Sequence, residues 1–419
     1  MTLSQTPPLS QTLDLGFVRS QFPAFASPIL GGHAFFENAG GSFPCAQVVS
    51  RLHRFYTDRK VQPYAPYAGA QEGGAEMDEA RARLSALMGC AYEELSFGPS
   101  TTANTYTLAN AVRIWLRDQK AAIVVTNQDH EANSGPWRRL EAEGIEVREW
   151  KIDPATGHLD IERLRGLLAD GRVKLLAFPH CSNVVAEINP VAEICALARE
   201  HGVRTVVDGV SYAPHGLPDF PGLGADVYLF SAYKTFGPHQ GLMMIRADFG
   251  AELPAQGHYF NAGSLYKRFT PAGPDHAQIA ASAGMADYID ALWAHHGGGE
   301  ALPVARNQFV HDLMRAQEVA VIRPLLDYLG TRNDVRLLGP KAAGDRAPTV
   351  AVALDRAAEP VAVALGVEGI ACWAGDFYAV RPLQAMGIDL DKGVLRMSAA
   401  HYTSPEDVSR LIAALDRLL

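Results

Sequence analysis

The fold is indicated most clearly by the stretch ADVYLFSAYKTFGPHQGLMMI, residues 225–245. It begins and ends with apolar segments rich in β-forming residues, and between these segments stands a single charged side chain, Lys234. A lysine at the end of a buried strand costs free energy unless it is neutralised, and burial lowers the pKa of its amine and makes it a nucleophile toward carbonyl groups. Taken alone, the stretch favours a lysine that extends its ammonium group to solvent, as most lysines do.

Composition narrows the class of protein. The 419 residues are 48% hydrophobic and 20% charged, with a net charge of -9, which is typical of a globular enzyme large enough for two domains. There is no basic block and no apolar run of the ~20 residues that span a bilayer, so we expect no nucleic-acid and no membrane partner. Five scattered cysteines without CxxC or zinc spacing predict no metal site and, with no signal peptide apparent, a cytoplasmic location.

Strands and helices alternate through the first two thirds of the chain. Continuous apolar runs at 121–125, 174–178 and 204–210 are typical of strands buried on both faces, and helical segments at 161–168 and 191–201 separate them. This order predicts an α/β fold with a doubly wound, mostly parallel sheet. Ligands of such sheets bind at the carboxyl ends of the strands.

Polar residues follow these strands where a ligand would lie. His130, Asn183 and Asp208 each stand at or just after the end of an apolar run. Asp208 precedes Lys234 by 26 residues, an arrangement that suits pyridoxal phosphate: the lysine forms the Schiff base and the carboxylate keeps the pyridinium nitrogen protonated. The imidazole of His130 could stack on the ring of that cofactor.

A helix start after the segment 94–99 could hold the cofactor's phosphate. Ser100, Thr101 and Thr102 offer hydroxyl groups together with the free N–H groups and positive dipole end of a helix. Ordinary N-capping accounts for this pattern equally well when it is taken alone. Together with His130, Asp208 and Lys234, however, the pattern predicts a pyridoxal phosphate site.

The last third of the chain predicts a second α/β unit. Strands are expected at 349–354 and 394–399, followed by a helix with Ser404 as its N-cap. Arg396 lies in the second of these strands and could hold a substrate carboxylate through two hydrogen bonds, although a surface salt bridge is the commoner role for a single arginine. We expect three parts: 1–30, packing on the small domain; 31–295, the large cofactor-binding domain; and 300–419, the small C-terminal domain.

The chain resembles the class V aminotransferases, in the branch of the SufS-like cysteine desulfurases and isopenicillin N epimerase. The matching segments, in family order, are Phe36-Glu-Asn-Ala39, Phe97-Gly-Pro-Ser-Thr-Thr102, Asp129-His-Glu-Ala-Asn133, Ser182-Asn-Val184, Val207-Asp-Gly209, Ser231-Ala-Tyr-Lys-Thr-Phe-Gly-Pro238 and Leu395-Arg-Met-Ser398. The resemblance implies a pyridoxal phosphate enzyme of fold type I, with a seven-stranded large-domain sheet. It also implies a homodimer with active sites near the interface.

The resemblance further implies residue roles. Lys234, His130 and Asp208 are the expected catalytic residues. The expected cofactor-binding residues are Ser100, Thr101, Thr102, His130, Asn183, Asp208, Ser211, Ser231, Tyr233 and Lys234. The expected substrate-binding residues are Asn38, Ala39, Gly40, Asn183, Tyr378 and Arg396.

Departures from the family pattern bear on the reaction. Tyr378 stands where desulfurases carry a nucleophilic cysteine, and Cys372 lies six residues earlier, where we expect a buried structural thiol. The family's Gly-Thr-Pro motif appears as Ala272-Gly-Pro-Asp-His276, without the threonine that reaches the partner's phosphate.

These departures favour transamination of a small α-amino acid through an external aldimine and a quinonoid. The alternatives are a cysteine desulfurase-like or other β-lyase, an amino-acid epimerase and, more distantly, a non-catalytic binding protein with the same fold.

Overall fold

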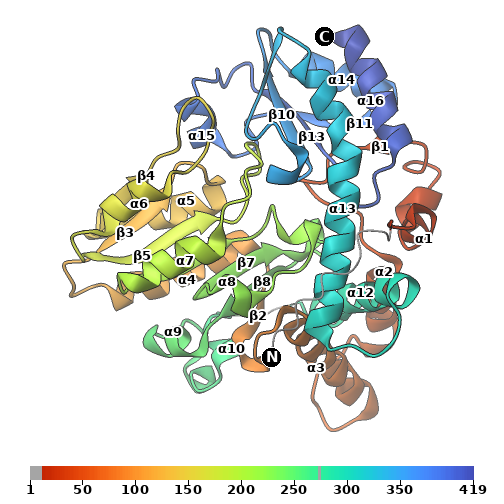
Figure 1. Ribbon diagram of the computed structural model, residues 1–419. Coiled ribbons are helices and arrows are strands. Elements are labelled where there is room, and N and C mark those ends of the chain that lie inside the picture. The colour runs from red at the N-terminus through yellow and green to blue at the C-terminus, as the bar shows by residue number, and fades with distance from the viewer. Residues whose placement is uncertain (1–11, 272–274) are drawn as a thin grey trace.

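The computed structural model describes residues 12–271 and 275–419 (Figure 1). Two segments lie outside the described residues. One is 272–274, within the segment that differs from the family's Gly-Thr-Pro motif, and the other is the first 11 residues of the predicted N-terminal part. The domain boundaries expected from the sequence remain predictions.

A seven-stranded sheet forms the larger part of the molecule, as predicted. Its strand order is β2-β8-β7-β6-β5-β3-β4, and β8 is antiparallel to both of its neighbours while the pairs from β7 to β4 are parallel. The strands are β2 (Leu95–Gly98), β3 (Ala122–Thr126), β4 (Glu146–Trp150), β5 (Val173–Pro179), β6 (Arg204–Asp208), β7 (Val227–Ser231) and β8 (Gly241–Ile245).

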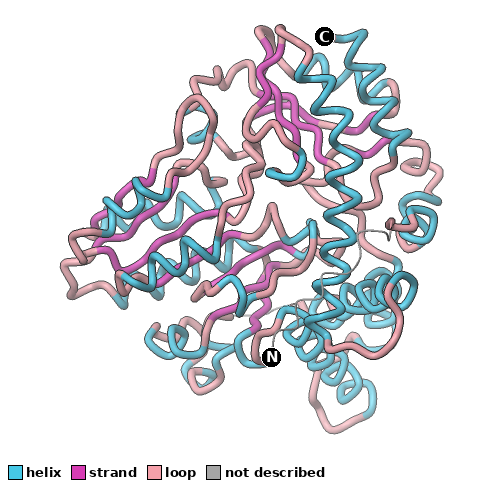
Figure 2. Tube along the Cα trace, in the orientation of Figure 1, coloured by secondary structure: helices cyan, strands magenta, loops and turns pink. Residues whose placement is uncertain are grey.

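Helices cover both faces of this sheet (Figure 2). In β7, Val227 and Leu229 belong to a core shared with α4 (Thr101–Trp115) and α5 (Glu131–Arg138), whereas the alternate residues Tyr228 and Phe230 belong to another core. That second core is shared with α3 (Ala68–Met88), α7 (Val191–Glu200) and α12 (Ala283–His296). Because successive side chains of a strand point to opposite faces, a strand covered on both faces must be apolar throughout, which explains the uninterrupted runs in the sequence.

A smaller, four-stranded antiparallel sheet has a core of its own. Its order is β12-β13-β10-β9, with α14 (Glu359–Val367) and α16 (Pro405–Leu418) packed in the same core. The strands are β9 (Val335–Leu337), β10 (Thr349–Leu354), β12 (Trp373–Gly375) and β13 (Val394–Ser398). A short parallel pair, β1 (Ala34–Phe35) with β11 (Ile370–Ala371), brings the segment after residue 35 beside β13.

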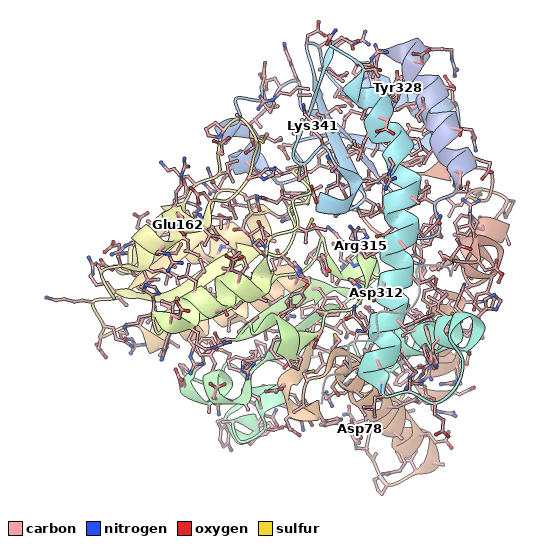
Figure 3. All side chains as sticks on the ribbon, viewed as in Figure 1. Asp78, Glu162, Asp312, Arg315, Tyr328 and Lys341 are labelled. Carbon is pink, nitrogen blue, oxygen red and sulfur yellow. The ribbon has the colours of Figure 1, made fainter. Side chains whose placement is uncertain are left out.

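One long helix, α13 (Pro303–Gly330), joins the two parts, and Figure 3 marks Asp312, Arg315 and Tyr328 along it. Its first half contributes Val310 to the core of the large sheet, and its second half contributes Leu325 to the core of the small one. The helix therefore fixes the small sheet relative to the carboxyl ends of the large one.

The remaining helices complete the fold. They are α1 (Leu15–Ser20), α2 (Ala46–Arg54), α6 (Ile161–Leu168), α8 (Phe220–Leu223), α9 (Ala247–Glu252), α10 (Leu265–Arg268), α11 (His276–Ala281) and α15 (Val380–Ala385). The cap predicted for the last helix is present: the hydroxyl of Ser404 accepts from the amide of Asp407, and the carboxylate of Asp407 accepts from the amide of Ser404. Within the described ranges, no helix has both the length and the apolar character needed to cross a membrane.

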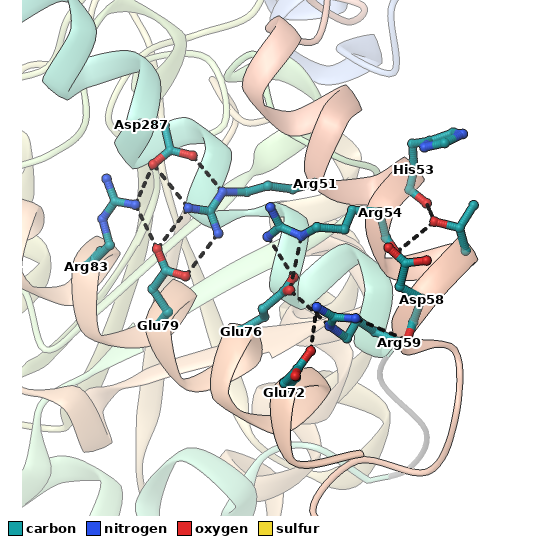
Figure 4. A network of polar contacts seen from close by, with 11 residues as sticks. Arg51, His53, Arg54, Asp58, Arg59, Glu72, Glu76, Glu79, Arg83 and Asp287 are labelled. Carbon is teal, nitrogen blue, oxygen red and sulfur yellow. Dashed lines mark hydrogen bonds and ion pairs between the residues drawn. The ribbon is translucent and has the colours of Figure 1, made fainter. Parts of the chain in front are cut away.

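A network of arginines and carboxylates ties α2, α3 and α12 together (Figure 4). Arg51 donates to both oxygens of Glu79, at 3.0 and 2.8 Å, and to both oxygens of Asp287, at 2.6 and 3.2 Å. Arg83 contacts the same two carboxylates and also Asp290. Each guanidinium group in this network contacts carboxylates of different helices, so the network holds these helices together.

Candidate active site

Two adjoining cavities open at the carboxyl ends of β3, β5, β6 and β7. The smaller has a volume of about 60 Å³ and the larger, which also reaches the small sheet, about 790 Å³. Both are lined by Thr102, His130, Ala132, Asn183, Tyr233 and Lys234. Because parallel strands end at the same edge of a sheet, residues far apart in the sequence meet here.

Lys234 lies between the two cavities, in the turn that follows β7. Burial of its amine, and next the positive charge of Arg396, lower its pKa to about 8, while the carboxylates of Asp208 and Glu37 oppose that shift. A lysine with a lowered pKa is more often in the neutral, nucleophilic form than an exposed one.

Asp208, the last residue of β6, lines the smaller cavity. Burial raises the pKa of its carboxyl group to about 6, although a hydrogen bond from the amide of Val210, at 2.9 Å, and the charge of Lys234 both lower it. A buried carboxylate with spare acceptor capacity is suited to a cationic or N–H group of a ligand.

His130 caps the start of α5 with its own ring. Its Nδ1 accepts a hydrogen bond from the amide of Ala132 at 3.0 Å, so in the neutral ring the proton lies on Nε2. Burial, and then the charges of Lys234 and Arg396, lower the pKa of His130 to about 3. The structure therefore presents a neutral imidazole to both cavities.

The start of α4 forms the polar end of the smaller cavity. Thr101 and Thr102 line it with Ser231, and the hydroxyls of Thr101 and Ser231 lie 2.8 Å apart. This close approach depends on Gly241 of β8, because a Cβ atom there would lie 2.3 Å from the carbonyl carbon of Ser100. Hydroxyl groups beside the N-terminus of a helix with 15 residues are a suitable site for a phosphate.

Arg396 provides the positive charge of the larger cavity. It lies on β13, is 3% exposed, and its guanidinium carbon lies 3.8 Å from the ring centroid of Phe377. Its Nη2 contacts Oε1 of Glu37 at 2.8 Å, and its Nη1 donates to the carbonyl oxygen of Asn183 at 3.4 Å. The small sheet therefore positions a buried cation facing the carboxyl ends of the large one.

The loop between β12 and α15 closes one side of the larger cavity. Phe377 and Tyr378 both have a φ of 55°, a left-handed conformation that is costly for residues with large side chains. Their carbonyl oxygens accept hydrogen bonds from Nδ2 of Asn183, at 2.9 Å, and from the amide of Glu131, at 2.8 Å. Tyr378 is 71% exposed, and its ring centroid lies 5.4 Å from that of His130.

The structure brings most of the predicted site together. All ten predicted cofactor-binding residues except Ser100 line the smaller cavity, and Ala39, Gly40, Asn183, Tyr378 and Arg396 line the larger one.

Ser100 and Asn38 lie elsewhere. Ser100 caps α4, its hydroxyl accepting from the amide of Ala103. Asn38 is buried beside β13, donating to the carbonyl of Ser398 at 2.8 Å and accepting from the hydroxyl of Tyr402. Both side chains already use their polar groups within the fold.

Sequence reasoning gave no role to several residues of the larger cavity. These are Glu37, Tyr106, Glu131, Asp376 and Phe377. Glu37 was visible in the segment Phe36-Glu-Asn-Ala39, but only the bridge between Glu37 and Ser398 brings it to Arg396.

The five cysteines all fall in the described part of the chain, and none of them lines the larger cavity. Cys372 is 9% exposed and packs in the core of the small sheet, where burial raises the pKa of its thiol to about 12. Cys181 lines the smaller cavity, and burial raises its pKa to about 12 as well. Within 12–271 and 275–419, no cluster of histidine, cysteine and acidic residues is arranged to hold a metal ion.

The residues that line the smaller cavity have the chemistry that pyridoxal phosphate requires. They combine a hydroxyl-lined helix start, a neutral imidazole, a buried carboxylate and a buried amine. In addition, Oδ1 of Asn183 is buried and finds no hydrogen-bond partner among the described residues. An unpaired buried acceptor in a native fold indicates a missing partner, which a ligand in this cavity would supply.

Comparison with known proteins agrees with this geometry. The family model described as Aminotransferase class-V matches residues 34–411. The chain is 31% identical to the aminotransferase-like protein FGM3 of Gibberella zeae, over 98% of this chain and 100% of that protein. It is 27% identical to the probable cysteine desulfurase 2 of Mycobacterium leprae, over 100% of this chain and 99% of that one.

Solved structures show the same fold. The apo cysteine desulfurase of Thermococcus onnurineus superposes with a TM-score of 0.84 at 21% identity, covering 98% of each chain. The cysteine desulfurase CsdA of Escherichia coli gives 0.77 at 22% identity, covering 97% of this chain and 99% of that one.

Proposed function

Because the chain belongs to the class V aminotransferase family, whose members use pyridoxal phosphate, we propose that it acts on a small α-amino acid in the cavity around Lys234. The observation that carries the proposal is the position of Lys234. Its amine lies buried at the junction of the two cavities, between Asp208 in the smaller one and Arg396 in the larger one.

The residues of the smaller cavity would hold the cofactor. Thr101, Thr102 and Ser231 would bind its phosphate, Asp208 its ring nitrogen and His130 one face of its ring. Lys234 would bond to its aldehyde carbon. When bound, pyridoxal phosphate supplies an electron-accepting ring that stabilises negative charge at the substrate's α-carbon.

The chain itself would bind the substrate and move its proton. Arg396 would hold the α-carboxylate and so fix which bond of the α-carbon faces the ring. Lys234, once its Nζ is released, would take the α-proton and return it to another atom. A cationic ring nitrogen beside Asp208 would lower the pKa of that carboxyl group and keep it ionised.

Breakage of a bond at the substrate's β-carbon is the first candidate reaction. The Mycobacterium leprae relative and both solved structures are called cysteine desulfurases, which supports this reaction more than the transamination expected from the sequence. A desulfurase needs a thiolate that reaches the substrate's sulfur, whereas Cys372 lies in a core with a raised thiol pKa. We therefore favour elimination: the carbon–sulfur bond of cysteine breaks, sulfur leaves with the electron pair, and hydrolysis yields pyruvate, ammonia and sulfide.

Transamination is the second candidate, and two observations favour it. A 31% identical relative is called aminotransferase-like, and none of the five cysteines lines the larger cavity.

Product analysis with cysteine separates these reactions. Pyruvate with sulfide supports elimination, alanine with protein persulfide would show desulfuration, and 3-mercaptopyruvate with aminated cofactor would show transamination. A protein that develops no visible absorption after cofactor addition would contradict the proposed function as a whole. The Lys234→Ala variant serves as the control for covalent cofactor binding.

We also propose that the enzyme is a cytoplasmic homodimer. Support for the dimer comes from Tyr259 and Phe260, large aromatic residues that are 89% and 69% exposed near a cavity of about 470 Å³ lined by Arg81 and Tyr266. Support for the location comes from five cysteines that form no disulfide. Light scattering at micromolar concentration tests the dimer, and a monomer mass would contradict it.

A further inference from the structure

Glu37 has no part in the proposed reaction, yet it lies in the substrate cavity. It lines the larger cavity with Lys234 and Arg396, and its carboxylate forms an ion pair with Arg396. The group expected to bind a substrate carboxylate is therefore already in contact with a carboxylate of the chain.

The pair leaves hydrogen-bonding capacity unused on both sides. Only one contact joins the two side chains, Nη2 of Arg396 with Oε1 of Glu37 at 2.8 Å. Oε2 of Glu37 and Nε of Arg396 are both buried, and neither finds a hydrogen-bond partner among the described residues. An arginine and a carboxylate that served only the fold would be expected to form two parallel bonds and leave no such atoms.

The backbone holds Glu37 in this position. Glu37 forms a parallel bridge with Ser398, two residues after Arg396 on β13, and its carbonyl accepts from the amide of Gly40. Gly40 also makes room for the carboxylate, because a Cβ atom at Gly40 would lie 2.5 Å from Oε1 of Glu37. The approach of Glu37 to Arg396 is therefore set by the backbone of the segment between β1 and α2.

We propose that Glu37 is a specificity-determining residue that competes with the ligand's carboxylate for Arg396 and repels a second carboxylate. This inference rests on the proposed function, because it takes Arg396 as the substrate's carboxylate site. Nη2 of Arg396 belongs to both faces of the guanidinium group that can bind a carboxylate through two hydrogen bonds, with Nε on one face and Nη1 on the other. A monocarboxylic ligand therefore forms such a pair only when Glu37 gives up its contact with Nη2. A dicarboxylic ligand would bring a second negative charge near the buried, unpaired Oε2, and Coulomb repulsion is strong where burial lowers the effective dielectric constant.

The test measures binding of two unreactive probes, propionate and succinate, by titration calorimetry. The proteins are the cofactor-loaded enzyme and its Glu37→Gln variant, which keeps the acceptor to Arg396 but removes the charge. We expect Glu37→Gln to bind propionate about tenfold more tightly, since a charge-assisted contact of Arg396 becomes available, and to gain more for succinate. Unchanged or weaker binding of both probes would overturn the proposal.

Two further variants separate contact from charge. Glu37→Asp keeps the charge but shortens the side chain, so propionate should gain affinity while succinate stays disfavoured. Glu131→Gln removes a charge from the same cavity, but Glu131 pairs with Arg381 and not with Arg396, so its effect on both probes should be smaller. An equal effect of Glu131→Gln would show that Glu37 acts only through the negative potential of the cavity. That result would contradict the proposed competition for Arg396. Should Glu37→Gln fail to fold, Glu37→Asp decides the outcome.

The measurement does not depend on turnover. Cofactor loading is followed separately by visible absorption. Tighter binding by Glu37→Gln in a protein that takes up no cofactor would support the competition and contradict the proposed function. Normal loading with unchanged probe binding would do the reverse.

Discussion

Two groups of arginines in this molecule meet carboxylates in different ways. Arg51 in the network of α2, α3 and α12 contacts both oxygens of Glu79 and both of Asp287, and it is partly reached by solvent (Figure 4). Arg396 is nearly buried, contacts a single oxygen of Glu37, and leaves its Nε without a partner among the described residues.

The difference distinguishes an arginine that stabilises the fold from one that binds a ligand. A buried guanidinium group with unmade hydrogen bonds costs free energy, and a fold retains that cost where a ligand removes it. The network of Arg51 has its bonds within the chain and holds helices together. In the cavity around Arg396, Lys234 and Asn183, polar groups remain without hydrogen-bond partners among the described residues, so they are available to a ligand.

The largest effect is expected at Lys234. Replacing it with alanine removes the proposed nucleophile and proton carrier, so turnover should fall by at least ~10³-fold. The cofactor's visible absorption should also lose the component due to its covalent link. Steady-state kinetics and absorption spectra measure the two effects. Turnover within tenfold of the unmodified enzyme would show that Lys234 does not carry the chemistry.

A matched pair of arginine substitutions tests the comparison directly. Arg396→Lys replaces a planar two-bond donor with a point charge, and we expect kcat/KM to fall about 10²-fold, mainly through KM. Arg51→Lys makes the same change in the network and should leave kcat/KM within twofold while lowering the free energy of unfolding by about 1–2 kcal/mol. Steady-state kinetics of both variants measures kcat/KM, and denaturant unfolding measures the free energy of unfolding. The comparison fails if the two variants lose activity equally.

The lowered pKa of Lys234 predicts a pH dependence of stability in the cofactor-free protein. Its pKa is about 8 in the folded chain and near 10.5 when unfolded, so between these values the unfolded chain binds more protons. Stability contributed by this group therefore rises as the pH increases from about 8 to 10.5, by roughly 2–4 kcal/mol. Denaturant unfolding of the unmodified protein and of Lys234→Met, measured across this pH range, gives the contribution of Lys234 as the difference between their free energies of unfolding. A difference that does not change with pH would contradict the burial of a neutral amine.

The smallest effect is expected at Cys372. Cys372→Ser places a hydroxyl in a core position whose thiol has a raised pKa, and it should change the rate of product formation from cysteine less than twofold. Folding is checked by thermal unfolding, because the hydroxyl lacks a partner in that core. Loss of sulfur release in a folded variant would show that the thiol takes part, and would restore a desulfurase mechanism.

Some features could be predicted because they depend on local sequence. The apolar runs of β3, β5 and β6 predict strands buried on both faces, and the structure confirms the seven-stranded sheet. The cap at Ser404 could also be predicted from the sequence, because a capping box spans only four residues. A division such as the one between α11 and α12 depends on tertiary contacts, because the hydroxyl of Ser282 between these two helices bonds to Gln240 from another part of the chain.

The amino-acid sequence by itself determined the family, the cofactor chemistry and the mostly parallel character of the large sheet. Lys234 and Asp208 stand at strand ends, and a parallel sheet places all such ends at one edge. Only the tertiary structure decided what faces Arg396. Glu37 lies 359 residues away from it in the chain, and the pairing of the segment after β1 with β13 brings the two together. The same holds for the left-handed conformation of Phe377 and Tyr378, which hydrogen bonds from Asn183 and Glu131 support. Contacts of this kind depend on packing between the two sheets, and no local pattern of residues encodes them.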